Sequence, residues 1–128
     1  MKYEKSCGCV IIDKGKVLLI KDTNNNWGFP KGHVEKGENE VETAKRETKE
    51  EVNIDVLIDE NRRYETIYKT DEETEKTVVY FVATPQNDKT IPQEGEIEDI
   101  VWLECDKALE QITFDNVREI FRKILLDT

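Results

Sequence analysis

The segment WGFPKGHVEKGENEVETAKRETKEEVNI, Trp27 to Ile54, decides the fold because it joins a glycine-containing loop to a run of glutamates. Like charges on neighbouring helical turns destabilise a helix by a few tenths of a kcal/mol per pair, so this repulsion needs an offsetting partner. Asn39 is a suitable N-cap, and Glu42 stands where the glutamate of a capping box belongs. The segment predicts a helix from Asn39 to about Val52.

This helix separates its residues into two adjoining faces at about 100° per residue. The buried face is formed by Val41, Ala44, Thr48 and Val52. Glu47, Glu50 and Glu51 project together from the edge of that face, where a hard cation such as Mg²⁺ would neutralise their repulsion. A solvated face with salt bridges is the alternative, and Arg46 is placed to pair with Glu50.

The loop before the helix decides between these alternatives. Its glycines free the backbone for unusual dihedrals and for a close approach to a ligand. Loop and helix together resemble the Nudix signature, G-x5-E-x7-R-E-U-x-E-E-x-G-U, where U is a bulky aliphatic residue. The matching residues are Gly32, Glu38, Arg46, Glu47, Glu50, Glu51 and Ile54. Thr48 stands where an aliphatic residue is usual and buries a hydroxyl, while Asn53 replaces a glycine in a position that favours a left-handed conformation.

The resemblance implies an α/β Nudix fold, with a mixed β-sheet sandwiched between α-helices in a single domain over residues 1–128. The residue patterns agree with it. They predict a hairpin of 6–13 and 16–22 turning at Lys14-Gly15, strands at 54–60, 62–69, 76–85 and 98–104, and a solvated connection at 70–75. Asp106 is expected to cap a short helix over 107–112, and an amphipathic helix follows Thr113.

Charge and composition narrow the function. The chain has 128 residues and a net charge of −10, which disfavours stable nucleic-acid binding and requires cations to mediate contact with an anionic substrate. Cys7, Cys9 and Cys105 are interpreted as reduced thiols, which predicts a cytoplasmic protein. No apolar run is long enough to span a membrane, so no membrane partner is expected. A monomer is the default expectation.

The sequence WGFPKGHVEKGE is similar to the Pro-Lys-Gly-His form found in asymmetrical diadenosine tetraphosphate hydrolases. The segments CGCVII, KTVVYFV, VWL and ITFDNVREI also resemble that family. The resemblance implies Mg²⁺-dependent hydrolysis of the small nucleotide diadenosine tetraphosphate to ATP and AMP, with Mn²⁺ as a possible substitute. Water would attack the fourth phosphate counted from the gripped adenosine.

The resemblance also implies roles for individual residues. Metal binding falls to Glu47, Glu50, Glu51 and Glu38. Glu96 is expected to join the glutamates of the Nudix signature as an additional ligand or base, with Glu94 and Glu98 as alternatives. Substrate contacts fall to Lys31, His33, Tyr68, Lys76, Tyr80 and Phe114, with Tyr68 and Phe114 stacking on the two faces of adenine. Gly32, Gly37 and Arg46 support the site.

Each of these substrate contacts has an ordinary structural alternative. The aromatic residues Tyr68, Tyr80 and Phe114 also fit core or sheet packing, Lys76 fits a plain surface position, and His33 fits a loop hydrogen bond. Trp27 and Trp102 are interpreted as structural. Two other functions stay open: another Nudix activity, on nucleoside triphosphates or the 5′ end of RNA, and a non-catalytic nucleotide-binding module. The acidic chain disfavours RNA, and the intact glutamates disfavour a pure binder.

Overall fold

The sheet starts with a hairpin of β1 (Lys2–Asp13) and β2 (Lys16–Asp22) in the computed structural model, which describes residues 1–128. Lys14 and Gly15 have φ values of 52° and 79°. Positive φ at both central residues gives a tight turn whose twist matches that of the flanking strands. The hairpin predicted at Lys14-Gly15 is therefore confirmed.

The remaining strands extend the hairpin on both sides and make the sheet mixed. β6 (Thr74–Pro85) runs parallel to β1, and β5 (Val56–Asp71) pairs with β6 in the antiparallel direction. On the other side, β3 (Trp27–Gly28) and β7 (Ile97–Glu104) pair with β2, while β4 (Lys31–His33) pairs with β1. The predicted mixed sheet is thus confirmed.

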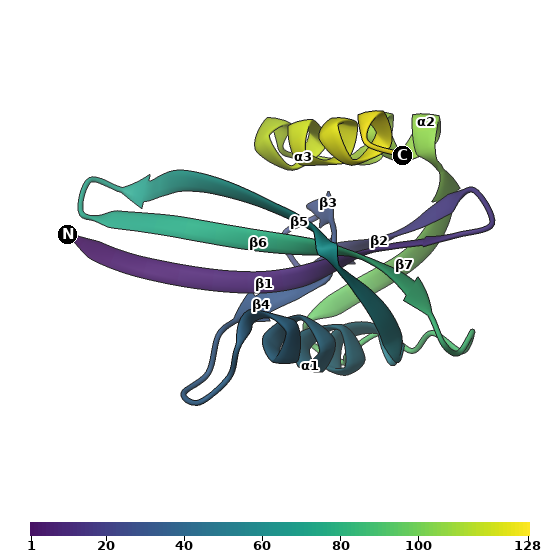
Figure 1. The fold of residues 1–128 in the computed structure, drawn as a ribbon, viewed down its shortest axis with the longest axis horizontal. Coiled ribbons are helices and arrows are strands. Elements are labelled where there is room, and N and C mark those ends of the chain that lie inside the picture. The colour runs from purple at the N-terminus through teal and green to yellow at the C-terminus, as the bar shows by residue number, and fades with distance from the viewer.

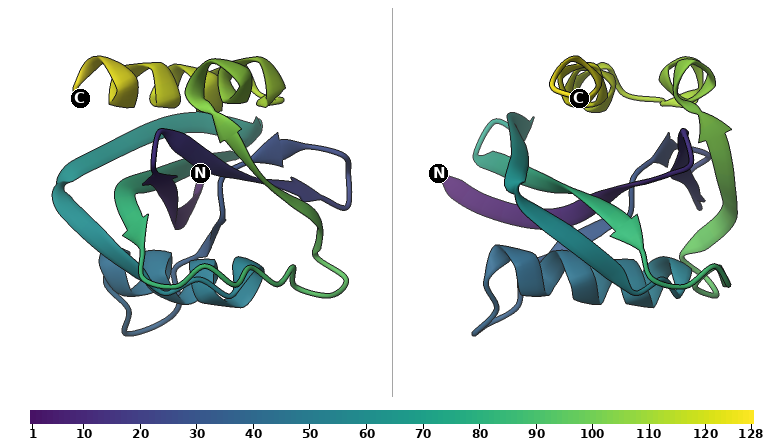
Figure 2. Two further views of the ribbon diagram at one scale, coloured as in Figure 1. Left: turned by 90° about the vertical axis from the view of Figure 1, so that its right-hand side faces the viewer. Right: turned by 45° about the vertical axis from the view of Figure 1, so that its right-hand side comes forward.

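Helices cover both faces of this sheet, as the sequence predicts. Helix α1 (Glu40–Val52) lies on one face, whereas α2 (Cys105–Gln111) and α3 (Asp115–Leu126) lie on the other (Figures 1 and 2). Helix α3 buries the amphipathic face predicted for it, namely Val117, Ile120, Phe121 and Ile124. No helix in the chain is long and apolar enough to cross a membrane.

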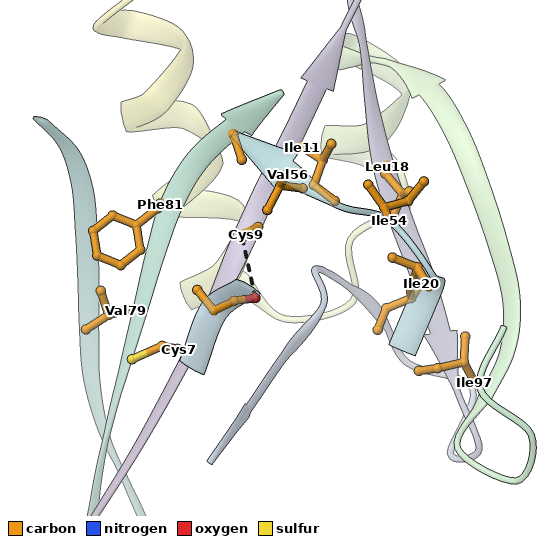
Figure 3. Packing of buried hydrophobic residues seen from close by; sticks show 13 residues of the cluster. Cys7, Cys9, Ile11, Leu18, Ile20, Ile54, Val56, Val79, Phe81 and Ile97 are labelled. Carbon is orange, nitrogen blue, oxygen red and sulfur yellow. Dashed lines mark hydrogen bonds between the residues drawn. The ribbon is translucent and has the colours of Figure 1, made fainter. Parts of the chain in front are cut away.

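Two hydrophobic cores result, because alternate residues of a strand point to opposite faces of the sheet. Val79 and Phe81 of β6 join the core beneath α1, whereas Val78 and Tyr80 join the core beneath α2 and α3. Figure 3 shows the first core, in which the Cys9 thiol contacts a backbone carbonyl of α1 at 3.7 Å. Burial in this core raises the pKa of Cys9 to about 12.

Both ends of α1 have the predicted geometry. The Glu42 amide donates to Asn39 Oδ1 at 2.8 Å, and the Asn39 amide donates to Glu42 Oε1 at 2.9 Å, which completes the capping box. Asn53 ends the helix in the left-handed conformation, with φ 63° and ψ 29°. The residue that departs from the usual glycine therefore adopts the conformation that glycine would supply.

Three local predictions are corrected by the structure. Segments 54–60 and 62–69 belong to one strand, β5, which spans Val56–Asp71. A bulge between Asp59 and Arg63 shifts the register of its pairing with β6 without ending the strand. The connection over 70–75 shrinks to a turn, since β6 already begins at Thr74. Helix α2 begins at Cys105, so Asp106 lies in its first turn and favours the helix dipole instead of capping it.

Candidate active site

Arg46 organises the acidic side of α1. Its Nε atom donates to Glu38 Oε2 at 2.6 Å, and its Nη1 atom donates to Glu47 Oε1 at 2.8 Å and to Glu50 at 3.2 Å. The predicted pair with Glu50 therefore exists, although Glu38 and Glu47 bind more closely. Hydrogen bonds from Arg46 lower the pKa of Glu38 to about 2, and Glu38 in turn raises the pKa of Arg46.

Gly32 lets Glu47 approach the loop. A Cβ atom added to Gly32 would overlap the carboxylate of Glu47, so any side chain there displaces that carboxylate. Gly32 belongs to β4, which hydrogen-bonds to Cys7 and its neighbours in β1. Gly32 is thus needed because there is no space for a side chain. Gly37 is needed for the turn before α1, where its φ is 86°.

Glu51 occupies the opposite kind of environment. It has no arginine or lysine ion pair, and its Oε1 atom accepts a hydrogen bond from the Lys31 amide at 2.8 Å. Burial raises the pKa of this carboxyl from 4.5 to about 8, and the charges of Glu47 and Glu96 push it in the same direction. The site therefore holds a partly buried carboxyl group that forms no ion pair.

Glu51 lines a cavity of about 290 Å³, the Glu51 cavity. Glu96 lies on its wall, whereas Glu94 and Glu98 line no part of it, and Glu98 instead faces Lys21 at 3.6 Å. Of the three glutamates considered before Val101, only Glu96 thus shares a cavity with Glu51, and Glu98 lies within β7. Its chemical role stays a prediction.

A second cavity of about 420 Å³, the Tyr68 cavity, lies between β5, β6 and the start of α3. The residues that line both cavities are Lys31, Tyr80, Phe114 and Val117. Tyr68 lines only the second cavity, together with Asn116 and others. The two cavities are therefore adjacent, and Phe114 lies at the boundary between them.

Two lysines bring positive charge to this boundary. Lys76 faces Tyr68 across the β5–β6 pair and lies close enough to Lys31 to affect its protonation. Burial lowers the pKa of Lys31, and repulsion from Lys76 lowers it further. Paired cations beside a buried carboxylate suit a ligand with several negative charges.

The exposure of the predicted aromatic contacts separates their alternatives. Phe114 is 51% exposed at the N-terminus of α3, so it is not a core residue. Tyr80 is 1% exposed and packs edge-on against Phe29, with ring centroids 5.6 Å apart. Tyr80 therefore combines core packing with a place on the wall of both cavities. Tyr68 is partly exposed within its cavity.

His33 is exposed and lines neither cavity. Its backbone carbonyl accepts a hydrogen bond from Arg46 Nη2 at 3.0 Å, a contact that does not involve the imidazole. The phosphate contact of the imidazole stays a prediction.

Three residues that shape the site were not predicted to do so from the sequence. Trp27 was expected to be purely structural but lines the Glu51 cavity, whereas Trp102 packs against the core beneath α1 as predicted. Gly8 of β1 lies so close to the loop that a Cβ atom there would overlap the Pro30 carbonyl and Lys31. Asn116 lines the Tyr68 cavity.

The donor atoms fit a hard divalent cation. Every candidate ligand is a carboxylate, and Glu51 is partly buried and forms no ion pair. No three acidic, histidine or cysteine side chains are already gathered to enclose an ion. Mg²⁺ usually binds through one or two carboxylates together with water and substrate phosphates, so a closed protein cage is not required. Nudix hydrolases generally need a divalent metal.

Comparison with known proteins identifies the class. The family model of the NUDIX domain matches residues 2–124, which include the loop, α1 and all seven strands. The chain therefore belongs to the Nudix family, and it is a pyrophosphohydrolase that acts on nucleoside polyphosphates. The predicted family and fold class are confirmed.

Individual relatives narrow the similarity. The asymmetrical bis(5'-nucleosyl)-tetraphosphatase of Sus scrofa is 31% identical, over 93% of this chain and 91% of the relative. The Caenorhabditis elegans protein of the same name is 32% identical, over 93% of this chain and 92% of the relative. A crystal structure of a C. elegans Ap4A hydrolase binary complex superposes with a TM-score of 0.85 at 30% identity and covers 96% of both chains.

Proposed function

We propose that this protein hydrolyses diadenosine tetraphosphate to ATP and AMP with the help of Mg²⁺. The observation that carries the proposal is the junction of the two cavities, where Lys31 lies between the Tyr68 cavity and Glu51. A nucleoside at one end and a carboxylate at the other leave room for a polyphosphate between them. The names of the relatives with similar length support the same substrate.

The gripped adenosine is assigned to the Tyr68 cavity. Tyr68 and Phe114 supply aromatic surfaces on its walls, and a stacked base gains roughly 1–3 kcal/mol by this kind of contact. Lys31 and Lys76 neutralise charge on the phosphates that lead away from this base, and Tyr80 closes the wall behind them. A phosphate contact by His33 stays part of the proposal on the resemblance alone.

The reacting end is assigned to the Glu51 cavity. Glu51, which lines the cavity, and Glu47, whose charge acts on Glu51, would hold Mg²⁺ (or Mn²⁺). Glu47 and Glu50 line neither cavity and pair with Arg46, so Glu50 as a further ligand and Glu38 as a support through Arg46 rest on the resemblance. The bound cation supplies Lewis-acid chemistry, polarising the phosphoryl group and making water more acidic. The residues themselves orient the phosphate and accept the proton.

The proposed reaction adds a water oxygen to the fourth phosphorus and breaks its bond to the oxygen that bridges to the third. The bridging oxygen leaves with ATP, and the attacked phosphate leaves as AMP. The water proton passes to a carboxylate of the cavity, where Glu51 and Glu96 are the two candidates. The acidic chain and this small-molecule geometry favour a nucleotide substrate over RNA, and a monomeric, cytoplasmic enzyme stays the expectation.

The test is product analysis of diadenosine tetraphosphate incubated with the protein and Mg²⁺ in ¹⁸O-labelled water. We expect equal amounts of ATP and AMP, with the label in AMP. Glu51→Gln should abolish both products, while Glu110→Gln, at an exposed position of α2, should leave them unchanged. Label in ATP would contradict attack at the fourth phosphorus, and turnover of nucleoside triphosphates alone would contradict the substrate.

A further inference from the structure

The Glu51 cavity continues past its carboxylates to the turn between β2 and β3. Asp22 shapes this turn, because its Oδ1 atom accepts the Asn24 amide at 2.8 Å and the Asn26 amide at 3.0 Å. Asn25 completes the turn with a φ of 64°. Asp22, Asn24, Asn26 and Trp27 all line the cavity. These four residues form the Asn24–Trp27 wall.

The two asparagines of this wall have unused hydrogen-bonding groups. Their backbone amides bind Asp22, whereas their side-chain amides form no hydrogen bond within the protein. Trp27 is fixed beside them, since its amide donates to Thr113 Oγ1 at 2.8 Å and its carbonyl accepts the Thr113 amide at 3.1 Å. The wall thus lines the cavity with an exposed asparagine, a partly buried asparagine and a partly buried tryptophan, and neither asparagine side chain is bonded within the protein.

The wall has the chemistry of a nucleoside site and not of a phosphate site. An asparagine amide both donates and accepts, which matches ribose hydroxyls and base edges, and an indole offers an apolar face. Asp22, Glu51 and Glu96 line this cavity with Lys31 as the one basic residue, so acidic side chains outnumber basic ones there. A neutral nucleoside avoids the repulsion that a further phosphate would meet there.

The substrate of the proposed function supplies such a group. It carries a nucleoside at each end, and the Tyr68 cavity takes only one of them. The attacked phosphate is joined to the second nucleoside by one ester bond, so that nucleoside lies in the same cavity as Glu51 and Glu96. We propose that the Asn24–Trp27 wall is the subsite of this second nucleoside, an inference that rests on the proposed function.

The test compares two substrates that differ only in the second nucleoside. Diadenosine tetraphosphate carries it, and adenosine 5′-tetraphosphate has the same first nucleoside and four phosphates without it. The double variant Asn24→Ala/Asn26→Ala should lower kcat/KM about tenfold for the dinucleotide, as expected for two lost hydrogen bonds. It should change kcat/KM for the mononucleotide by less than twofold. If the mononucleotide is not turned over, its inhibition constant gives the same comparison.

Two control variants define the result. Asn61→Ala, an exposed asparagine of β5 outside both cavities, should leave both substrates unaffected. Tyr68→Ala should weaken both substrates equally, because both retain the first nucleoside. Equal losses for the two substrates in the double variant, or no loss for either, would overturn the second subsite alone. Failure of the wild-type protein to cleave the dinucleotide would overturn the proposed function as well.

Discussion

The two ends of α1 place the same residue type in opposite environments. At the N-terminal end, the Glu40 carboxylate accepts hydrogen bonds from Arg63 Nε at 2.7 Å and from Arg63 Nη2 at 2.8 Å. Its Oε2 atom also forms an ion pair with Lys5 Nζ at 2.5 Å. Hydrogen bonds from Arg63 lower the pKa of Glu40 to about 2. At the C-terminal end, Glu51 forms no ion pair, and burial raises its pKa to about 8.

The difference separates glutamates that stabilise the fold from a glutamate that the fold leaves unsatisfied. Glu38 and Glu40 are neutralised by arginines of the chain itself, so they need nothing from outside. The charged form of the Glu51 carboxyl is favoured by Lys31, through the hydrogen bond from its amide and the charge of its side chain, but burial outweighs both. A perturbed carboxyl in a cavity is a common property of catalytic sites.

The largest effect is expected from removing the charge of Glu51. Glu51→Gln should lower kcat for diadenosine tetraphosphate about 10³-fold, since a positioned carboxylate that handles a proton contributes roughly 10²–10⁴-fold. Steady-state kinetics at saturating Mg²⁺ measure the loss. The same change at Glu40 should leave kcat within twofold, and a kcat for Glu51→Gln within tenfold of wild type would contradict the distinction.

The pH dependence of stability should also differ between the two ends. The folded state keeps a proton on Glu51 up to about pH 8, whereas the unfolded chain releases it near 4.5. The free energy of unfolding without metal should therefore fall as pH rises between these values, by about 1.4 kcal/mol per unit. Urea denaturation of the chelator-treated protein measures this slope.

Two comparisons sharpen the pH result. Glu51→Gln should remove the contribution of this residue, so the variant should be more stable than the wild type at pH 8 without metal. Adding Mg²⁺ should stabilise the wild type more at pH 8 than at pH 5, because a cation favours the charged carboxylate. Parallel curves for wild type and variant would contradict the raised pKa.

A smaller effect is expected from Gly32→Ala. The added methyl group displaces the Glu47 carboxylate, and misplacing a catalytic group by about 1 Å can cost roughly 10²-fold. We expect kcat to fall 10- to 100-fold. The double variant Gly32→Ala/Glu47→Gln should be no worse than Glu47→Gln alone, because both changes act on the same carboxylate. Full additivity would mean that the methyl group acts elsewhere.

The smallest effect concerns the paired end of the helix. Glu40→Gln should reduce the free energy of unfolding at pH 7 by about 0.5–1 kcal/mol, because partly exposed ion pairs are screened by water. The pKa of Glu40 is lowered in the folded state, so its contribution is present above about pH 4.5 and disappears as pH falls through about 2. A thermal denaturation series at pH 2 to 7 tests this, and a constant difference would contradict it.

The sequence predicts those parts of the fold that depend on local chemistry. Asn39 and Glu42 form the expected capping box, and Lys14-Gly15 forms the expected hairpin turn. The bulge in β5 was not predicted, because pairing with β6 keeps the strand continuous across Asp59 and Arg63. Long-range pairing of this kind leaves no local pattern in the sequence.

The site divides in the same way. The residues of the Nudix signature could be predicted because their spacing is fixed within one loop and helix. Trp27 and Asn116 join the cavities only through the packing of β3 and α3 around the sheet, so no spacing along the chain connects them. Gly8 could not be predicted either, since its requirement comes from the Pro30 carbonyl on a different segment.

Thr48 is a position at which the protein can be stabilised without changing the site. Its buried hydroxyl accepts or donates no hydrogen bond of normal geometry, its effect being confined to the neighbouring Cys9 thiol, and the site chemistry lies on the neighbouring face of α1. Thr48→Val replaces that hydroxyl with a methyl group of similar shape, which is expected to raise the melting temperature. The stabilised chain would then serve as a background in which damaging variants of the catalytic helix still fold and can be measured.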